Sequence, residues 1–532
     1  MRGQVWRRGA LAVLGGALLY LGHPPADLAW TGVLALVPLL LLARDLADGR
    51  RPARRGAGWG LLAGVAFFGP LLSWILRFGV VPFALLTLLQ AAAVAAFVAF
   101  LSRWGGRPGR PAVAVVAWVA LEAVRGSWPL GGFPWGGLGY TQHDGGLLLP
   151  AARSVGVLGV SAACAAIAVC VEEGGWRVWR SWPAFRAAGP RGDVRADVLF
   201  GALRTPLLSG LGILVLSVLL AGEPPAPTGR TLDIAAVQGT NIRSTSAAGV
   251  TRVSTDRIIR VAEQMVLATR PLAADPPELT IWPENSLDAD VTDERNATVR
   301  ALVSEALDLL GGAPLLANGA LAGPRPATFL NAMLQVASDG TVVDAYVKRR
   351  PVPFAEYIPG RRWLDWFPPL DQIPSDALPG AEPGVFSVAG TRVGTVICFE
   401  NIFPELVHSQ VREGAQLLVV STNNTSFGRS AMSSQHLAFS QVRAVETGRW
   451  VLHAGISGIS GVVDPEGRVT QRTALFEEAI VRADLPLVEG RTLATRLGGA
   501  IGWAAVALFA LALAWLVVDR RRGRTPPRPG LR

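Results

Sequence analysis

Residues 346–357 read YVKRRPVPFAEY, and they hold the only lysine of the 532-residue chain, Lys348. Every other basic residue is an arginine. A lysine ammonium group is compact and rotatable and its pKa can be shifted, whereas a guanidinium group is planar and permanently charged. Lys348 could be a chance survivor on a solvated loop, but its isolation in so arginine-rich a chain favours a role that arginine cannot fill.

Two other reactive residues, Glu284 and Cys398, share the position of Lys348 at the end of a predicted strand. Glu284 follows the strand-like run LTIW, and Cys398 ends the run TRVGTVIC. Strand ends converge on one edge of the sheet in α/β folds, and ligands bind there. A carboxylate beside a thiol can take its proton and create a nucleophilic thiolate. A lysine beside both, helped by the backbone N–H of Phe399, can stabilise the thiolate and then the oxyanion.

Strands and helices alternate around these three residues. The expected strands are 232–239, 279–282, 315–319, 331–338, 341–347, 391–398, 417–422, 450–455 and 459–463. The expected helices are about 252–269, 293–310, 403–413 and 433–447. The turn Asp339-Gly340 predicts a hairpin between the fourth and fifth strands. This alternation predicts an α/β sandwich layered around β-sheet.

The rest of the chain is much more apolar. Half of all residues are hydrophobic, and the mean hydropathy is +0.36. Several apolar runs reach the ~20 residues that a membrane-spanning helix needs, and more spans follow the first one, which argues against a signal peptide. We expect eight membrane helices, at about 9–22, 29–44, 58–77, 81–102, 111–125, 154–172, 206–222 and 497–518.

Arginines mark one side of this membrane domain. They cluster before the first span, in every second connection and after the last span, within residues 2–8, 50–55, 103–110, 177–195 and 520–524. By the positive-inside rule these segments and both termini are cytoplasmic, and the polar stretch 223–496 is extracytoplasmic. Residues 225–490 hold 22 basic and 29 acidic side chains, so the net charge of +10 comes from the membrane topology. We therefore reject a nucleic-acid-binding function.

These boundaries define five parts. They are a membrane domain at 1–222, a linker rich in proline at 223–230, a catalytic domain at 231–490, an eighth membrane helix at 491–519 and a basic tail at 520–532. Residues 351–380 interrupt the α/β pattern with prolines and with Trp363 and Trp366. Such a long irregular loop is either a lid that contacts lipid or substrate, or a segment packed onto its own domain.

Metal and cofactor chemistry finds little support. Cys164 and Cys170 lie inside the sixth span and are expected to be small apolar helix residues, and Cys398 has no disulfide partner in its own domain. The five histidines lack metal-ligand spacing, so we assign them structural roles and expect no metal. No phosphate-binding glycine loop is present, and we expect no cofactor.

The motifs W-P-E, Y-x-K-x-x-x-V-P-F-x-E-Y and C-F-E, in this order, resemble those of the nitrilase superfamily. Eight membrane helices with such a domain between the seventh and eighth resemble the apolipoprotein N-acyltransferase family across nearly the whole chain. GFPW at 132–135, Gly139-Tyr140 and VQG at 237–239 also match that family. The resemblance implies a polytopic helical membrane domain plus an extracytoplasmic nitrilase-like α-β-β-α sandwich.

The resemblance also implies roles for the site residues. Glu284 is the general base, Lys348 stabilises the thiolate and the oxyanion, and Cys398 is the nucleophile. Glu356 orients Lys348, and Glu400 supports activity. Phe399 stands where the family usually has tyrosine, which keeps the ring and the N–H but loses the hydroxyl. The expected substrate contacts are Trp363, Trp366, Asn423 and Phe427, the last two in a stretch that departs from the family's W-F-G pattern.

The implied activity is transfer of an acyl chain from a membrane phospholipid, through a cysteine thioester, to the α-amine of the diacylglyceryl-cysteine of an apolipoprotein. Two alternatives remain open. The same three residues would serve a membrane-anchored amidase or nitrilase acting on a small extracytoplasmic amide. In some relatives the membrane part is fused to, or partnered with, a polyprenol-phosphate mannosyltransferase, so a scaffolding role or such a partner is also possible.

Overall fold

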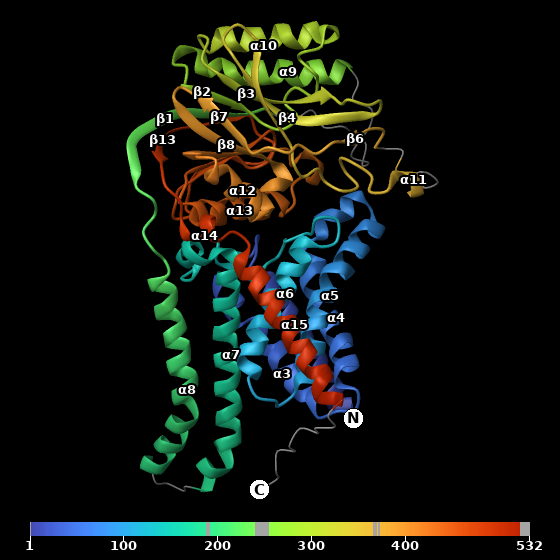
Figure 1. Cartoon of the computed structure of the whole chain (residues 1–532), viewed down its shortest axis with the longest axis vertical. Helices are drawn as coiled ribbons and strands as arrows, with labels where there is room; N and C mark the ends of the chain where they lie inside the picture. Colours follow the sequence, from blue (N-terminus) through green and yellow to red (C-terminus); the bar gives the residue numbers. More distant parts are fainter. Residues whose placement is uncertain (1, 188–191, 240–254, 365–369, 371–372, 522–532) are drawn as a thin grey trace. The chain divides into compact units, whose positions relative to one another are not determined.

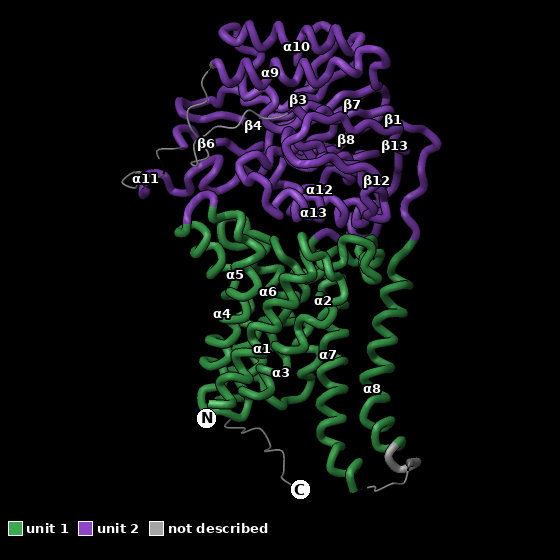
Figure 2. Tube along the Cα trace, turned by 180° about the vertical axis from the view of Figure 1, so that it is seen from behind, with its two compact units in different colours: residues 1–76, 80–222, 499–532 green, residues 77–79, 223–498 purple. Residues whose placement is uncertain are grey.

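The computed structural model describes residues 2–187, 192–239, 255–364, 370 and 373–521. The chain divides into two compact units (Figure 2). Unit 1 comprises residues 1–76, 80–222 and 499–532, and unit 2 comprises residues 77–79 and 223–498. Apart from residues 77–79, unit 2 is thus an insertion between two parts of unit 1.

Unit 1 is helical. Its helices are α1 (Arg2–Leu21), α2 (Ala29–Leu34), α3 (Leu36–Ala47), α4 (Pro52–Leu71), α5 (Val80–Trp104), α6 (Arg110–Ser127), α7 (Ala152–Ala187), α8 (Gly192–Leu219) and α15 (Ala500–Arg521), with 3₁₀ turns η1 (Ser73–Phe78), η2 (Leu138–Gln142) and η3 (Leu149–Ala151). Every predicted span lies largely on helix, although 206–222 runs past the end of α8 and 497–518 begins before α15. Five segments of the described chain are long and apolar enough to cross a membrane: Ala29–Ala47, Val80–Trp104, Leu149–Ala187, Ala196–Leu219 and Ala500–Arg520. Since α1, α4 and α6 are not among them, the count of eight crossings stays a prediction.

Small residues set the closest helix packing in unit 1. Gly56, Gly60 and Gly64 recur every four residues and form one face of α4, which packs on α5. A Cβ added at Gly64 would lie 2.6 Å from the Cα of Ala91 in α5. Spacing of small residues by four lets two helix backbones approach closely, and van der Waals contact then holds them together where no hydrophobic effect is available.

Unit 2 contains two β-sheets. The seven-stranded sheet has the order β13-β1-β2-β3-β4-β5, with β6 paired to β4; the six-stranded sheet has the order β12-β11-β10-β9-β8-β7. The strands of the first sheet are β1 (Pro227–Gln238), β2 (Leu279–Trp282), β3 (Leu315–Ala322), β4 (Thr328–Val336), β5 (Val342–Val347), β6 (Asp376–Ala377) and β13 (Ala479–Val488). Those of the second are β7 (Gly384–Val388), β8 (Thr391–Ile397), β9 (Leu417–Thr422), β10 (Val451–Gly455), β11 (Gly461–Val463) and β12 (Val469–Arg472).

Helices cover the outer face of each sheet (Figure 1). α9 (Thr255–Thr269) and α10 (Ala297–Leu309) pack on the first sheet through one apolar core, and α12 (Pro404–Arg412) and α13 (Met432–Thr447) pack on the second through another. A third core fills the space between the sheets, with Ile234 and Ile281 from one side and Val393 and Val419 from the other. The order of layers is helix, sheet, sheet, helix, which confirms the predicted α-β-β-α sandwich.

The predicted boundaries differ from the structure in three places. β1 begins at Pro227, so residues 227–230 are strand and not linker; Pro227 pairs with Val488 of β13, and the register shifts before the next pair, Thr231 with Pro486. The short helix α14 (Leu493–Leu497) belongs to unit 2, and the last long helix begins only at Ala500. β6, β7, β12 and β13 have no counterpart among the predicted strands.

Candidate active site

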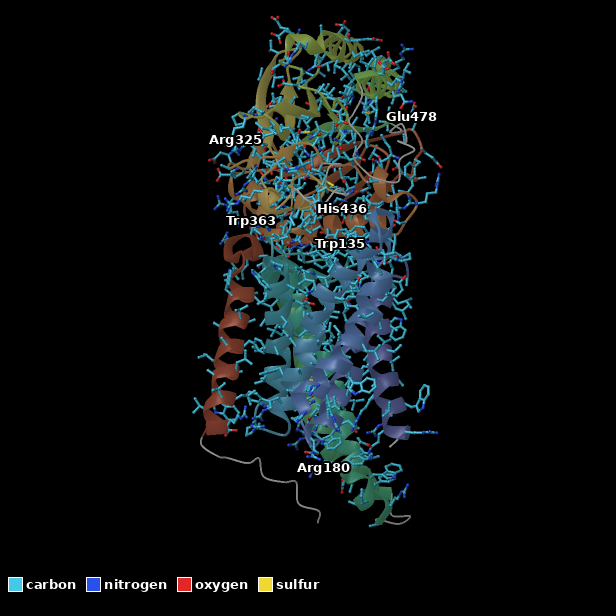
Figure 3. The ribbon with its side chains drawn as sticks, turned by 90° about the vertical axis from the view of Figure 1, so that its right-hand side faces the viewer. Trp135, Arg180, Arg325, Trp363, His436 and Glu478 are labelled. Atoms are coloured by element: carbon cyan, nitrogen blue, oxygen red, sulfur yellow. The ribbon has the colours of Figure 1, made fainter. Side chains whose placement is uncertain are left out.

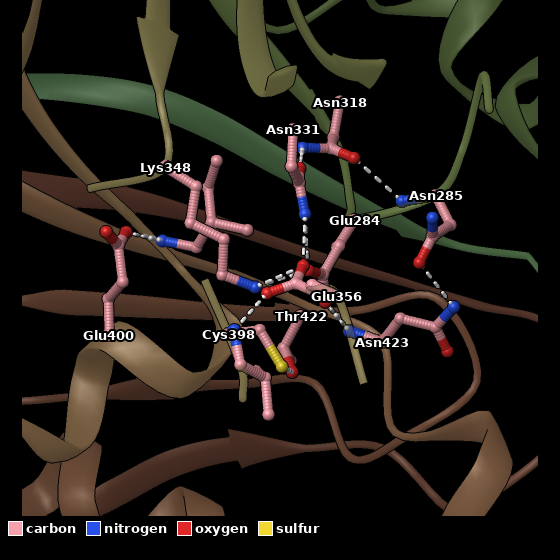
Figure 4. Close-up of polar contacts among 12 residues, drawn as sticks. Glu284, Asn285, Asn318, Asn331, Lys348, Glu356, Cys398, Glu400, Thr422 and Asn423 are labelled. Atoms are coloured by element: carbon pink, nitrogen blue, oxygen red, sulfur yellow. Dashed lines mark hydrogen bonds and ion pairs between the residues drawn. The ribbon is translucent and has the colours of Figure 1, made fainter. Parts of the chain in front are cut away.

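Strand ends bring the predicted site residues together in unit 2. Glu284 lies two residues beyond β2, Lys348 directly follows β5, and Cys398 follows β8 as the first residue of the 3₁₀ turn η7 (Cys398–Ile402). β2 and β5 belong to one sheet and β8 to the other. The site therefore forms where the ends of both sheets meet, and Figure 4 shows the side chains converging there.

Lys348 is the centre of a buried ion cluster. Its Nζ lies 3.1 Å from Oε1 of Glu284 and 2.9 Å from Oε1 of Glu356. Its side chain is 1% exposed. Burial opposes the charged form, but the two carboxylates outweigh it and raise the pKa of Lys348 above its usual value. Lys348 is therefore a cation in the resting site, and the predicted stabilisation of a thiolate and an oxyanion requires a cation.

Asn331 joins the two carboxylates from the opposite side. Its Nδ2 donates to Oε1 of Glu284 at 3.0 Å and to Oε1 of Glu356 at 2.9 Å. Its own Oδ1 accepts a hydrogen bond from Nδ2 of Asn318 at 2.8 Å. Asn331 thus fixes the spacing of the two glutamates around Lys348. The sequence interpretation did not include it, although a hairpin turning at 339–340 already places Asn331 opposite Lys348.

The second oxygen of Glu284 is held by the loop after β9. Oε2 accepts the backbone N–H of Asn423 at 2.9 Å. The Asn423 side chain donates to Oδ1 of Asn285 at 2.9 Å and accepts the backbone N–H of Thr425 at 3.0 Å. In this structure Asn423 positions Glu284 through its backbone, a contact that the predicted substrate-binding role did not include.

Cys398 adopts a left-handed backbone conformation, with φ of +50°. Such a conformation is strained for a residue with a side chain and persists only where neighbouring groups impose it. Burial raises the pKa of the Cys398 thiol to about 12, with the Glu284 carboxylate acting in the same direction and Lys348 opposing it. The Cys398 thiol is therefore neutral at rest, and the predicted nucleophilic role would require a base that removes its proton as the sulphur reacts.

Glu400 lies fully buried on the far side of Lys348. Its Oε1 accepts the backbone N–H groups of Arg349 and Arg350 at 2.7 and 3.1 Å. Its Oε2 accepts the hydroxyl of Tyr346 and the backbone N–H of Ile397, each at 2.8 Å. Glu400 thus ties the end of β5, which carries Lys348, to the end of β8, which carries Cys398.

The aromatic residues expected at the site contact other aromatic rings or solvent in the described structure. Phe399 follows Cys398 and packs edge-on against Phe403. Phe427, in the short turn η8 (Thr425–Phe427), packs edge-on against Phe78. Trp363, in α11 (Arg361–Leu364), is 70% exposed. Trp366 lies outside the described residues, so the predicted lid stays a prediction.

Two histidines, His436 and His453, lie buried near Cys398. His436 on α13, labelled in Figure 3, is buried, and its Nε2 lies 3.0 Å from the backbone carbonyl oxygen of Cys398. His453 packs against His436 with a ring-centroid distance of 5.1 Å and contacts Ser440 at 2.8 Å. Within the described residues, no three His, Cys, Asp or Glu side chains are grouped in a way that could hold a metal ion.

Two segments of the chain each match a known family model. Residues 15–170 match the family model of the apolipoprotein N-acyltransferase N-terminal domain. Residues 235–495 match the family model of the carbon-nitrogen hydrolases. This range includes most of the sandwich and the site residues described above. An amidase of the nitrilase superfamily from Nesterenkonia aligns with 50% of this chain and 94% of its own, at 21% identity and a TM-score of 0.35.

Similar proteins extend across both units. The apolipoprotein N-acyltransferase of Geobacter metallireducens is 30% identical over 515 residues, which cover 93% of each chain. That of Mycolicibacterium smegmatis is 32% identical over 540 residues, covering 97% of this chain and 86% of the relative. The helical unit, the nitrilase-like sandwich and this full-length similarity together show that the chain belongs to the apolipoprotein N-acyltransferase family of the nitrilase superfamily.

Proposed function

We propose that this membrane acyltransferase moves an acyl chain from a phospholipid to Cys398, and from Cys398 to the α-amine of the diacylglyceryl-cysteine of an apolipoprotein. Family membership supports the overall reaction. The observation that carries the covalent mechanism is the buried cluster of Lys348, Glu284 and Glu356 beside a thiol that is neutral at rest.

The first half of the reaction forms a thioester. Glu284 accepts the thiol proton while Sγ of Cys398 attacks the ester carbonyl carbon of the phospholipid. Lys348, together with the backbone N–H of Phe399, stabilises the resulting oxyanion. Collapse of this intermediate breaks the ester bond, and the proton held by Glu284 passes to the departing lysophospholipid oxygen.

The second half regenerates the enzyme. The amine of the apolipoprotein attacks the thioester carbonyl, and Glu284 takes a proton from the nitrogen as the amide bond forms. The thiolate of Cys398 leaves and recovers its proton from Glu284. Glu356 and Asn331 keep Lys348 and Glu284 in place throughout, since Glu356 accepts a hydrogen bond from Lys348, and Asn331 donates to both Glu284 and Glu356. Lipid-facing loops would exclude water from the thioester, because water would hydrolyse it.

The test is intact mass spectrometry of the purified full chain incubated with a phospholipid of one acyl composition. The expected result is one added acyl group, located on Cys398 by peptide analysis and lost on addition of a diacylglyceryl peptide. Cys398→Ala should show no adduct. A double replacement of Cys164 and Cys170, which lie in α7, should keep it. An acyl adduct on Cys398 that passes only to water would favour the amidase alternative.

The orientation of the chain is also a proposal. The arginine-rich segments support a cytoplasmic location for both termini and an extracytoplasmic location for unit 2. A reporter that is active only outside the cytoplasm should give signal when fused after residue 240 and none when fused after Arg195 or at the C-terminus. The opposite pattern would overturn this orientation. A mannosyltransferase partner remains a prediction that co-purification would test.

A further inference from the structure

The parallel strands β8, β9 and β10 of the second sheet end at the same edge. Ile397 of β8 pairs with Ser421 of β9, and Thr422 of β9 pairs with Gly455 of β10. This register sets Thr422, the last residue of β9, beside Cys398, the first residue after β8. The Oγ1 of Thr422 lies 3.3 Å from the Sγ of Cys398, and Figure 4 shows the two side chains in contact.

The Thr422 hydroxyl faces more acceptors than it has hydrogens. Besides the Cys398 sulphur, Oγ1 lies 3.2 Å from Oδ1 of Asn424 and 3.4 Å from Nδ1 of His436. A hydroxyl group carries one hydrogen, so it can donate to one of these three atoms at a time. Thr422 is fully buried, and its hydroxyl therefore depends on these protein groups.

The protonation of His436 makes its Nδ1 an acceptor. Its Nε2 contacts the carbonyl oxygen of Cys398, which can only accept, so Nε2 must carry the ring hydrogen. Burial lowers the pKa of His436 to about 4, so the ring is neutral at physiological pH. The neutral ring with hydrogen on Nε2 leaves Nδ1 as a lone-pair acceptor for Thr422.

We propose that Thr422 is a further catalytic residue. Its hydroxyl group rotates whenever the Cys398 sulphur becomes an anion, so that its hydrogen bond to Asn424 or His436 is replaced by one to that sulphur. A thiol sulphur is a weak acceptor, whereas hydrogen bonds to charged groups are roughly twice as strong as neutral ones. The neutral thiol therefore leaves the hydrogen with Asn424 or His436, and a thiolate attracts it.

No bond to hydrogen breaks in this rearrangement. The thiol proton still passes to Glu284, and Thr422 keeps its hydrogen while the hydroxyl rotates. The rotation is needed twice, once when Sγ attacks the phospholipid ester and once when thiolate leaves the thioester. Two carboxylates and one ammonium group give the site an excess of negative charge, so a buried thiolate requires every donor available.

The proposal rests on Cys398 being the nucleophile, so the test measures the sulphur and not acyl transfer. The detergent-solubilised full chain is treated with iodoacetamide at several pH values between 7 and 10, and alkylation of Cys398 is followed by peptide mass spectrometry. Thr422→Val keeps the shape and removes the hydroxyl. We expect it to slow alkylation roughly 10–100-fold at each pH, the loss typical of a hydrogen bond to a charged group.

Two companion variants separate the hydroxyl from packing. Thr422→Ser restores the donor and should recover most of the lost reactivity. Thr395→Val removes another buried hydroxyl, from β8, that has no hydrogen-bond partner among the described residues, and should alkylate at the parent rate. Parent-like alkylation of Thr422→Val, or an equal loss in Thr422→Ser, would overturn the proposal. If the parent alkylates as expected but never gains an acyl group from phospholipid, the proposed function fails while this inference stands.

Discussion

Both units bury charged groups, but they do so in different ways. In unit 1, Arg44 forms hydrogen bonds of 2.6 and 2.9 Å with Glu172 and 2.8 Å with Glu173. Arg110 contacts Glu172 at 3.2 Å and the carbonyl oxygen of Leu40 at 2.9 Å. In unit 2, one lysine faces two glutamates through a single nitrogen.

The difference separates a structural cluster from a reactive one. With Arg177, whose Nε lies 3.2 Å from Oε1 of Glu173, three arginines face two glutamates, and their planar forks fix the geometry of the helices that carry them. Lys348 leaves its cluster with an uncompensated negative charge, which adds to the larger effect of burial in raising the pKa of the Cys398 thiol. Its ammonium group can also turn toward a new acceptor when an oxyanion forms. In the proposed mechanism, the lone lysine thus stands where a rotatable cation is needed.

Exchanging lysine for arginine in unit 2 should have the largest effect. Lys348→Arg keeps the charge, but the guanidinium group is too large and too rigid to contact both glutamates and the oxyanion. We expect acylation of a lipoprotein substrate to fall by at least ~10²-fold, close to the rate of Lys348→Ala. Expression and membrane insertion should be normal. Arg392→Lys, an exposed exchange in β8, is the matched control.

A rate for Lys348→Arg above about a tenth of the parent rate, against the ~10²-fold loss expected, would show that the site needs only a positive charge. An arginine would then serve in unit 2 as arginines do in unit 1, and the presence of a single lysine in the sequence would be unexplained.

Removing the Asn331 side-chain amide, which joins the two glutamates, should have the next largest effect. Asn331→Leu removes the amide donor that Glu284 and Glu356 share and leaves Lys348 as the donor common to both, so the spacing of the two glutamates is held less firmly. Acyl transfer should slow roughly 10–100-fold, as expected for hydrogen bonds to charged groups. Gln335→Leu, on the same strand but bonded to Ser387, controls for the change of side-chain type. Equal rates for these two variants would remove Asn331 from the site.

The reverse exchange in unit 1 should affect stability and not chemistry. Arg110→Lys cannot reach both Glu172 and the carbonyl of Leu40, so one buried hydrogen bond is lost. The free energy of unfolding should fall by about 1–2 kcal/mol, measured as a lower melting temperature in detergent. Alkylation of Cys398 at a fixed pH should be unchanged. A slower alkylation rate would mean that the unit 1 cluster is coupled to the site.

Acid should weaken unit 2 gradually through the buried side chain of His436. Burial lowers the pKa of His436 from 6.5 to about 4, so between these values the unfolded chain binds a proton that the folded chain does not. Stability is therefore complete above pH 6.5 and falls as the pH drops toward 4, by at most about 1.4 kcal/mol per pH unit for this residue. His436→Asn should show a shallower dependence in thermal unfolding from pH 7 to 5. An unchanged slope would assign the acid sensitivity to other groups.

The sequence predicted much of this site because strand ends carry a clear signal. Glu284, Lys348 and Cys398 each follow an apolar run, and the structure brings Glu284 and Lys348 into direct contact and sets Cys398 beside them. Glu356 came only from the family resemblance, because no periodicity marks a residue in an irregular loop. Its contact with Lys348 is the one the resemblance implied.

Residues that position the reactive groups were harder to find. Thr422 and His436 are buried polar residues on a strand and a helix, and their patterns resemble those of ordinary core residues. Only the pairing of β8 with β9, which joins residues far apart in sequence, places Thr422 beside the sulphur. Edge strands such as β7 and β12 were missed because they are short and their pattern is weak.

The pairing of β1 with β13 has a consequence for biosynthesis. These strands open and close unit 2, and they lie side by side from Pro227 paired with Val488 to Gln238 paired with Ala479. The first strand made must therefore wait for the last one before its edge is covered, while the whole intervening chain is synthesised. Because α15 follows directly, release of the final helix into the bilayer and closure of the sheet become neighbouring events in time.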